Sequence, residues 1–289
     1  MSILDEYFGI FAEGEKDVLY RRMAQDALRK TVAALKTPKA KAAMETMGNE
    51  YGNFVEFDMV ELLEEPEFSG LLLSFVFDEE AVGKRNGGFK PKPQPTIELN
   101  FDRQVPADGP TLAKMLEMKR DVFMHEFIHY LDFKRMGPRG SDVVTKTSAT
   151  AKHGTGDSDR QKYVSSPMEY NAFFQQGIGN IENYLNSLPP ESRSRVAQKM
   201  LGGSPNEFWK RITDSLKGQP WFNSLFVKHL DDKMLDKFKK RSAQAYLEIM
   251  RGLRSAEKWR GGPEKDKATR IAKLKAGQAR ATAKKAERG

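Results

Sequence analysis

The stretch HEFIH, residues 125–129, decides how the rest of this 289-residue chain is organised. Two histidines four residues apart on a helix differ by about 40° around its axis, so both imidazoles reach the same point. Neutral imidazole is a good zinc ligand. Glu126 follows the first histidine, where it can reach a water at the metal without binding the metal itself. The spacing therefore predicts a metal site built on one helix.

The sequence around this motif predicts a long, buried helix. Residues 111–135 contain neither glycine nor proline, and one helical stripe contains Met118, Val122, His125, His129 and Asp132. Large apolar residues cover the other sides of the motif, which is typical of a buried helix. Buried histidines need partners, and zinc would supply one partner for both. The alternative is a pair of core histidines that hydrogen-bond elsewhere.

The composition excludes several classes of protein. The chain has no cysteine, so disulfides and cysteine-ligated zinc sites are excluded. Its first residues lack the basic region and long apolar stretch of a secretory signal. The longest apolar run, residues 71–77, is far too short to span a bilayer. We therefore expect a soluble, cytoplasmic protein without a membrane span.

The periodicity of apolar residues predicts an α+β fold with a small sheet. An amphipathic helix is predicted at residues 16–36, and alternating patterns predict three strands near residues 55–60, 71–77 and 97–101. The glycine-rich, proline-rich residues 83–95 are predicted to form a long exposed loop. Strands followed by a buried helix favour the α+β class. Four further helices are predicted near residues 167–188, 191–201, 205–216 and 221–253.

These elements suggest four segments: an N-terminal helical segment at 1–52, a zinc-site domain at 53–190, a helical region at 191–256 and a basic tail at 257–289. Residues 137–166 have almost no apolar periodicity and are predicted to be a loop. A loop this long is either functional, here as a border of the metal site, or a surface excursion.

A catalytic zinc site normally needs a third protein ligand. The candidates are Asp132, His153, Asp157, Asp159 and Glu169. Glu169 lies on a predicted helix that begins near Ser166 and Pro167, where it could cross the motif helix. The same spacing, Ser166-x-x-Glu169, is also a capping box, in which the glutamate turns back to its own helix terminus. The two roles compete for one carboxylate.

Two motifs together resemble a known family. HEFIHYLD, followed about forty residues later by YVSSPMEYNAFFQQ, is similar to the zincin metallopeptidases, zinc-dependent peptidases whose third ligand is a glutamate on a later helix. The chain is similar in particular to metallopeptidases carried by phages and bacteria. The resemblance covers residues 101–188. It implies that His125, His129 and Glu169 bind zinc, that Glu126 is the general base, and that Asp132 orients a ligand histidine.

The chain departs from the related zincins that use aspartate as third ligand. GTGD at residues 154–157 partly matches their pattern, but Arg160 and Gln161 stand where a Tyr-Gly pair should follow. We therefore rank Glu169 ahead of Asp157. His153, in a loop rich in glycine and lysine, is interpreted as a solvated histidine.

The resemblance also implies a reaction and a substrate. Zinc and Glu126 would activate water for attack on an amide carbonyl. Tyr163, shortly before Glu169, is the candidate for stabilising the oxyanion, with ordinary loop packing as its alternative. A protein or peptide substrate would pair with an edge strand, expected at residues 97–101.

Other functions remain open from the sequence. One is a structural or virion-associated interaction protein that keeps the fold and uses the metal as a staple; intact Glu126 favours catalysis instead. Another possible function is suggested by residues 263–289. They contain nine Lys or Arg but only three Asp or Glu, within a chain of net charge +8. This tail predicts weak, sequence-independent and salt-sensitive binding of nucleic acid or an acidic partner, or simply greater solubility.

Overall fold

The computed structural model describes residues 13–47, 53–80, 86–102, 108–137, 157–215 and 226–260. The N-terminal half contains α2 (Glu13–Leu35), α3 (Pro38–Met47), β1 (Phe54–Asp58), α4 (Met59–Leu63), β2 (Leu72–Phe77), β3 (Gly87–Lys90), β4 (Thr96–Phe101), α6 (Gly109–Met118) and α7 (Arg120–Met136). The remainder contains α9 (Asp157–Val164), α10 (Pro167–Ser187), α11 (Pro190–Leu201), α12 (Phe208–Ser215) and α13 (Asp232–Arg260). None of the described helices has the length and hydrophobicity that crossing a membrane would need. Helix α13 extends into the predicted basic tail as far as Arg260, and the rest of that tail lies outside the described residues.

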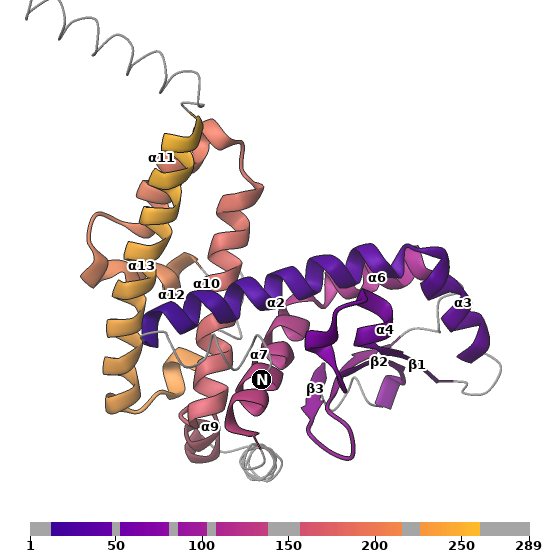
Figure 1. The fold of residues 1–289 in the computed structure, drawn as a ribbon. Helices are drawn as coiled ribbons and strands as arrows, with labels where there is room; N and C mark the ends of the chain where they lie inside the picture. The colour runs from indigo at the N-terminus through magenta and orange to yellow at the C-terminus, as the bar shows by residue number, and fades with distance from the viewer. Residues whose placement is uncertain are drawn as a thin grey trace, which may run out of the picture.

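The α+β class is confirmed: one mixed sheet with the strand order β1-β2-β4-β3 is flanked by helices (Figure 1). β2 pairs antiparallel with β1 and parallel with β4, and β4 pairs antiparallel with β3. The three predicted strands are present, although the first ends at Asp58, whose carboxylate caps α4. Strands β2 and β4 are central and largely buried on both faces.

Strand β3 corrects the prediction of a long loop at residues 83–95. Its sequence, GGFK, has almost no alternating apolar pattern, so only its neighbours reveal it as a strand. Phe89 anchors it against Tyr130 and Phe133 of α7. A Cβ on Gly87 would come within 2.6 Å of Glu98 O and Val122 Cγ1, so glycine lets this strand approach both β4 and α7 closely. The sheet therefore has four strands, and β3 lies at one edge.

The structure has two helices where the sequence predicts one at residues 111–135. Helices α6 and α7 are separated at Lys119, whose φ and ψ are −99° and 17°. The Lys119 ammonium donates to Asn86 Oδ1 at 2.7 Å and lies over the ring of Phe101, contacts that the local sequence does not reveal. The break separates Met118, which is 58% exposed, from the buried stripe to which the sequence pattern assigned it.

Two hydrophobic cores meet at α10 (Figure 1). The first lies between the sheet, α2, α6 and α7, and it includes Met168 and Ala172 of α10. The second is formed by α9 to α13 and includes Phe174, Phe226 and Phe238. α9 lies within the predicted loop at residues 137–166, so the end of that stretch is helical rather than irregular. Helix α2 spans from the helical region to the sheet and packs against α6, α7 and α10.

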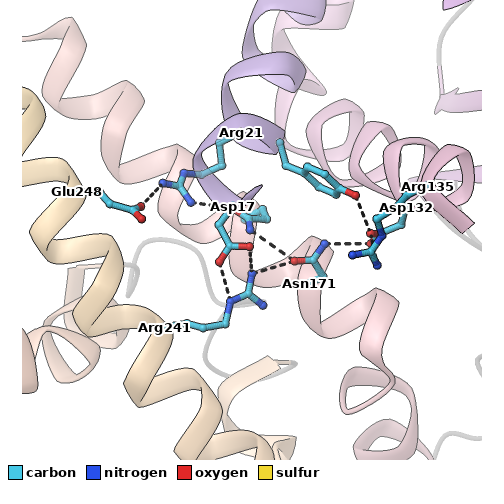
Figure 2. Close-up of polar contacts among 9 residues, drawn as sticks. Asp17, Arg21, Asp132, Arg135, Asn171, Arg241 and Glu248 are labelled. Atoms are coloured by element: carbon cyan, nitrogen blue, oxygen red, sulfur yellow. Dashed lines mark hydrogen bonds and ion pairs between the residues drawn. The ribbon is translucent and has the colours of Figure 1, made fainter. Parts of the chain in front are cut away.

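Buried charged side chains tie the terminal helices to α7 and α10 (Figure 2). Arg241 of α13 donates to both carboxylate oxygens of Asp17 on α2, at 2.9 and 2.6 Å, and to Asn171 Oδ1 on α10 at 2.9 Å. Asn171 donates in turn to Asp132 of α7 at 3.0 Å. Removing one partner of such a buried pair typically costs about 3–5 kcal/mol. Segments far apart in sequence therefore fix how α7 and α10 cross.

A second buried arginine connects the same terminal helices further along α10. The guanidinium of Arg21 donates to both carboxylate oxygens of Glu182 at 3.1 Å, to Gln175 Oε1 at 2.8 Å and to Glu248 Oε2 at 3.3 Å. Arg21 is fully buried, so these partners replace its hydration.

Candidate metal centre

Helix α7 holds the HEFIH motif in the interior, as predicted. Every residue from Phe123 to Asp132 is buried. The helix lies between the sheet, α2 and α10, so few of its sides face water (Figure 1). His125 is 8% exposed, His129 6% and Glu126 9%. These three polar side chains therefore need partners within the protein.

Helix α10 supplies partners for the two histidines through a ladder of polar pairs. From the start of α7 to its end, Asp121 is paired with Asn180, His125 with Gln176, His129 with Glu169 and Asp132 with Asn171. The residue numbers rise on α7 while they broadly fall on α10, so the two helices run antiparallel. The ladder places the two histidines opposite the first turns of α10.

The three predicted ligands lie together at the centre of this ladder. Glu169 Oε2 is 3.2 Å from His125 Nε2, and Glu169 Oε1 is 3.4 Å from His129 Nε2. The two Nε2 atoms are 3.1 Å apart. One potential ligand atom from each residue falls within a group whose members are all within 4.8 Å of one another. Two imidazoles and one carboxylate form a ligand set that catalytic zinc sites use.

The structure also resolves the competition for the Glu169 carboxylate. Ser166 is the N-cap of α10, yet its side chain makes no capping hydrogen bond. The Ser166 hydroxyl oxygen is buried and has no hydrogen-bond partner in the part of the chain that the structure describes. Glu169 contacts both histidines instead, so the capping box does not form and the carboxylate remains in the metal centre.

The charges of the triad depend on one another. Burial alone would raise the pKa of Glu169, but the positive charge of His129, with which Glu169 is also hydrogen-bonded, holds that pKa far below its usual value. Burial alone would lower the pKa of His129, but Glu169 outweighs it, with help from Glu126 and Asp132, and raises that pKa to about 9. Without a metal at neutral pH, Glu169 is therefore a carboxylate and His129 an imidazolium.

Among the described residues, Asp132 makes no hydrogen bond to a ligand histidine, the contact through which the resemblance implies that it would orient one. Its carboxylate accepts hydrogen bonds from Tyr20 at 3.2 Å and Asn171 at 3.0 Å, and Arg135 lies 3.3 Å away. The Nδ1 atom of His129 is buried and has no hydrogen-bond partner among the described residues. The hydrogen bonds of Asp132 run to α2 and α10 instead, which the sequence of one helix cannot show.

The contacts of His125 come from two residues that the sequence reasoning missed. His125 Nδ1 lies 3.2 Å from Gln176 Oε1, and the His125 ring packs on Phe173 with centroids 4.5 Å apart. Phe173 and Gln176 follow Glu169 by four and seven residues, so all three lie on one face of α10. That spacing is the signal from which both contacts were predictable once Glu169 was assigned to the centre.

Tyr163, the candidate for stabilising an oxyanion, lies beside the triad. It comes from the last turn of α9, and its side chain hydrogen-bonds with Glu169. Its ring contacts Phe173 edge-on. Burial, with further contributions from Glu169 and Glu126, raises the pKa of Tyr163 well above its usual value. Tyr163 is therefore a neutral phenol at physiological pH.

The side chains of the alternative third ligands Asp157, Asp159 and His153 lie outside what the structure describes. Asp157 and Asp159 lie in α9, where their backbone is described but their side chains are not. His153 lies outside the described residues. The triad of Glu169 with the two histidines is complete without them.

The donor atoms of the triad suit a divalent metal such as zinc. In the form that donates to Gln176, His125 carries its proton on Nδ1 and its free lone pair on Nε2, toward Glu169 and His129. The comparison of this chain with protein-family models, curated proteins and solved structures found no match. The metal assignment therefore depends on the motif and on the geometry of the triad.

The raised pKa of His129 predicts pH-dependent metal binding. A coordinating imidazole must be neutral, so metal binding has to displace the His129 proton at any pH below about 9. The apparent zinc association constant should rise about tenfold per pH unit and level off near that pKa. Calorimetric titrations in buffers of different ionisation enthalpy should show about one proton released per zinc at neutral pH. Zinc binding with no proton release would contradict this description of the triad.

Proposed function

We propose that this protein is a zinc-dependent metallopeptidase. The observation that carries the proposal is the buried triad of His125, His129 and Glu169 with Glu126 next to the first ligand. This set matches the two-histidine, one-glutamate ligands of catalytic zinc in known peptidases. A bound zinc ion would lower the pKa of a water molecule toward about 7 and polarise the carbonyl of the substrate.

Glu126 is proposed as the general base. It is buried on α7, beside the triad but outside it, and its charge influences both His129 and Tyr163. A carboxylate in this position would take a proton from the attacking water and deliver it to the leaving nitrogen of the peptide bond. Because Glu126 is not a ligand, its base function is separable from metal binding.

Tyr163 is proposed to stabilise the oxyanion. As a neutral phenol beside Glu169, its hydroxyl has a proton to donate to a developing negative charge. Without substrate the hydroxyl is engaged with Glu169, so donation to the oxyanion would require exchanging that hydrogen bond.

The proposed substrate is an extended polypeptide that pairs with β3. The expectation of pairing with residues 97–101 is wrong, because β4 is bonded to β2 on one side and to β3 on the other. The edge strand next to α7 is β3. Its Gly87 and Gly88 add no side-chain bulk to this edge. Main-chain pairing would make recognition depend on an unfolded or extended substrate rather than on one side chain.

The second candidate function is that of a structural protein, in which the metal would stabilise the fold and take no part in catalysis. The observation that favours it is the enclosure of the triad, whose three side chains are each about nine-tenths buried. A structural site would be similarly closed. A general base is not needed in such a site, which is why Glu126 supports the peptidase.

Cleavage of unfolded proteins distinguishes the peptidase from the structural protein. We expect the zinc-loaded protein to cleave unfolded casein, to lose this activity when a chelator removes the metal, and to recover it when zinc is returned. Melting temperature should fall on chelation in either case, because a ligand that binds only the folded state stabilises it. Zinc binding and stabilisation without cleavage of any unfolded substrate would favour the structural protein.

A further inference from the structure

We propose that Gln176 is the positioning residue for His125, holding its imidazole so that Nε2 is the atom presented to the metal. This inference rests on the proposed metal centre, and it assigns the role that the sequence had given to Asp132. The starting observation is the 3.2 Å contact between His125 Nδ1 and Gln176 Oε1 in the interior of the protein.

The chemistry of this contact selects one form of the imidazole. An amide oxygen only accepts hydrogen bonds, so the contact requires the proton of His125 to lie on Nδ1. In a neutral imidazole the lone pair then lies on Nε2. Nε2 is the His125 atom that lies 3.2 Å from Glu169 and 3.1 Å from His129 Nε2. With a metal bound among the three ligands, Gln176 would therefore hold the tautomer whose Nε2 lone pair is free for the ion.

Burial makes this selection effective. Gln176 is 6% exposed and His125 8% exposed, so water competes little for either side of the hydrogen bond. Phe173 packs on the His125 ring at 4.5 Å and restricts the rotation that would exchange the two nitrogens. Glu169, Phe173 and Gln176 form one face of α10, so a single helix provides a ligand, a ring contact and an acceptor.

The two ligand histidines differ in this respect. Nδ1 of His129 is buried without an acceptor among the described residues, and Asp132 is engaged with Tyr20 and Asn171. His129 is instead placed by its contact with Glu169. His125 is thus the histidine whose orientation is set before the metal arrives, and Gln176 is the residue that sets it.

The test compares Gln176→Leu, Gln176→Glu and the neighbouring Gln175→Leu. Gln175 has the same side chain on the same helix and is also buried, but it accepts from Arg21 instead of from a ligand. We expect Gln176→Leu to weaken zinc binding about 10–100-fold, the usual effect of losing a partner of a ligand histidine. Gln176→Glu keeps an acceptor of nearly the same shape and should bind zinc at least as tightly as the unaltered protein. Gln175→Leu should lower the melting temperature while leaving zinc affinity unchanged.

A spectroscopic measurement distinguishes positioning from a general loss of structure. In the zinc-loaded protein, the Nδ1 proton of His125 should give a nitrogen-correlated NMR signal that exchanges slowly with water. Gln176→Glu should retain this slow exchange and Gln176→Leu should lose it. If Gln176→Leu does not fold, Gln176→Glu alone still decides, since weakened zinc binding in that variant would overturn the acceptor role.

The inference and the proposed function fail in different ways. If the unaltered protein binds no zinc, the metal centre itself is wrong. If it binds zinc and Gln176→Leu binds equally tightly with an unchanged His125 signal, the metal centre remains and the role of Gln176 is wrong. Equal weakening by Gln176→Leu and Gln175→Leu would also overturn it, because packing of α10 would then explain the effect.

Discussion

Replacing Glu126 by glutamine should remove peptide hydrolysis and leave the metal in place. General acid–base catalysis contributes about 10²–10⁴-fold to rates, and we expect kcat/KM to fall by about that factor. Glutamine has the shape of glutamate but cannot take a proton from water at neutral pH. Because Glu126 lies outside the His125, His129 and Glu169 triad, the variant should bind zinc as the unaltered protein does.

The matched control is Glu117→Gln, which makes the same chemical change at an exposed position on α6. Its activity and zinc content should both be normal. Full hydrolysis by Glu126→Gln would exclude Glu126 as the base. A loss of zinc from that variant would instead mean that Glu126 contributes to metal binding.

Replacing Glu169 by alanine should weaken zinc binding by more than about 100-fold, the upper range for losing a partner that does not itself bind the metal. The variant lacks one of three ligands, and both histidines lose the carboxylate that lies 3.2 and 3.4 Å from them. A second consequence is electrostatic. Without Glu169, the largest influence that raises the pKa of His129 to about 9 is gone, so that pKa should fall.

Asp157→Ala is the control for this prediction, because Asp157 is the alternative third ligand from the sequence. Its zinc affinity should be unchanged in a competition titration with a fluorescent chelator. The reverse result, with tight binding by Glu169→Ala and weak binding by Asp157→Ala, would place the aspartate in the centre. Histidine NMR titrations of metal-free Glu169→Ala would measure the expected fall in the pKa of His129.

The metal centre could be predicted largely because its geometry is local. The spacing of His125 and His129 fixes their common face on any helix. Glu169 required more, since its sequence also fits a capping box, and only the crossing of α10 over α7 decides between the two roles. The structure shows that packing takes the carboxylate away from its own helix terminus.

The sequence predictions were wrong where distant segments of the chain determine the local structure. Strand β3 forms from GGFK because β4 and α7 provide partners for it, whereas its own sequence predicts a loop. The break at Lys119 occurs without glycine or proline, beside contacts to Asn86 and Phe101. The contacts of Lys119 are to residues 18 or more positions away, and β3 also depends on residues of α7, so helical or strand periodicity detects neither feature.

The polar network between the terminal helices could likewise not be predicted from the sequence. Arg241 and Asp17 are 224 residues apart, and each has an ordinary surface-like pattern around it. Their pairing, together with Asn171, occupies the side of α10 that does not face the histidines. Asn171 also donates to Asp132, whereas Gln176 lies beside His125.

The most direct test of the central claim is the zinc content of the purified protein, measured beside His129→Ala. We expect one zinc per chain in the unaltered protein and almost none in the variant after dialysis against a weak chelator. X-ray absorption at the zinc edge should then show nitrogen and oxygen neighbours near 2.0–2.1 Å, about the distances of histidine and carboxylate ligands. A protein without zinc, or a His129→Ala variant that keeps it fully, would contradict the metal centre described here.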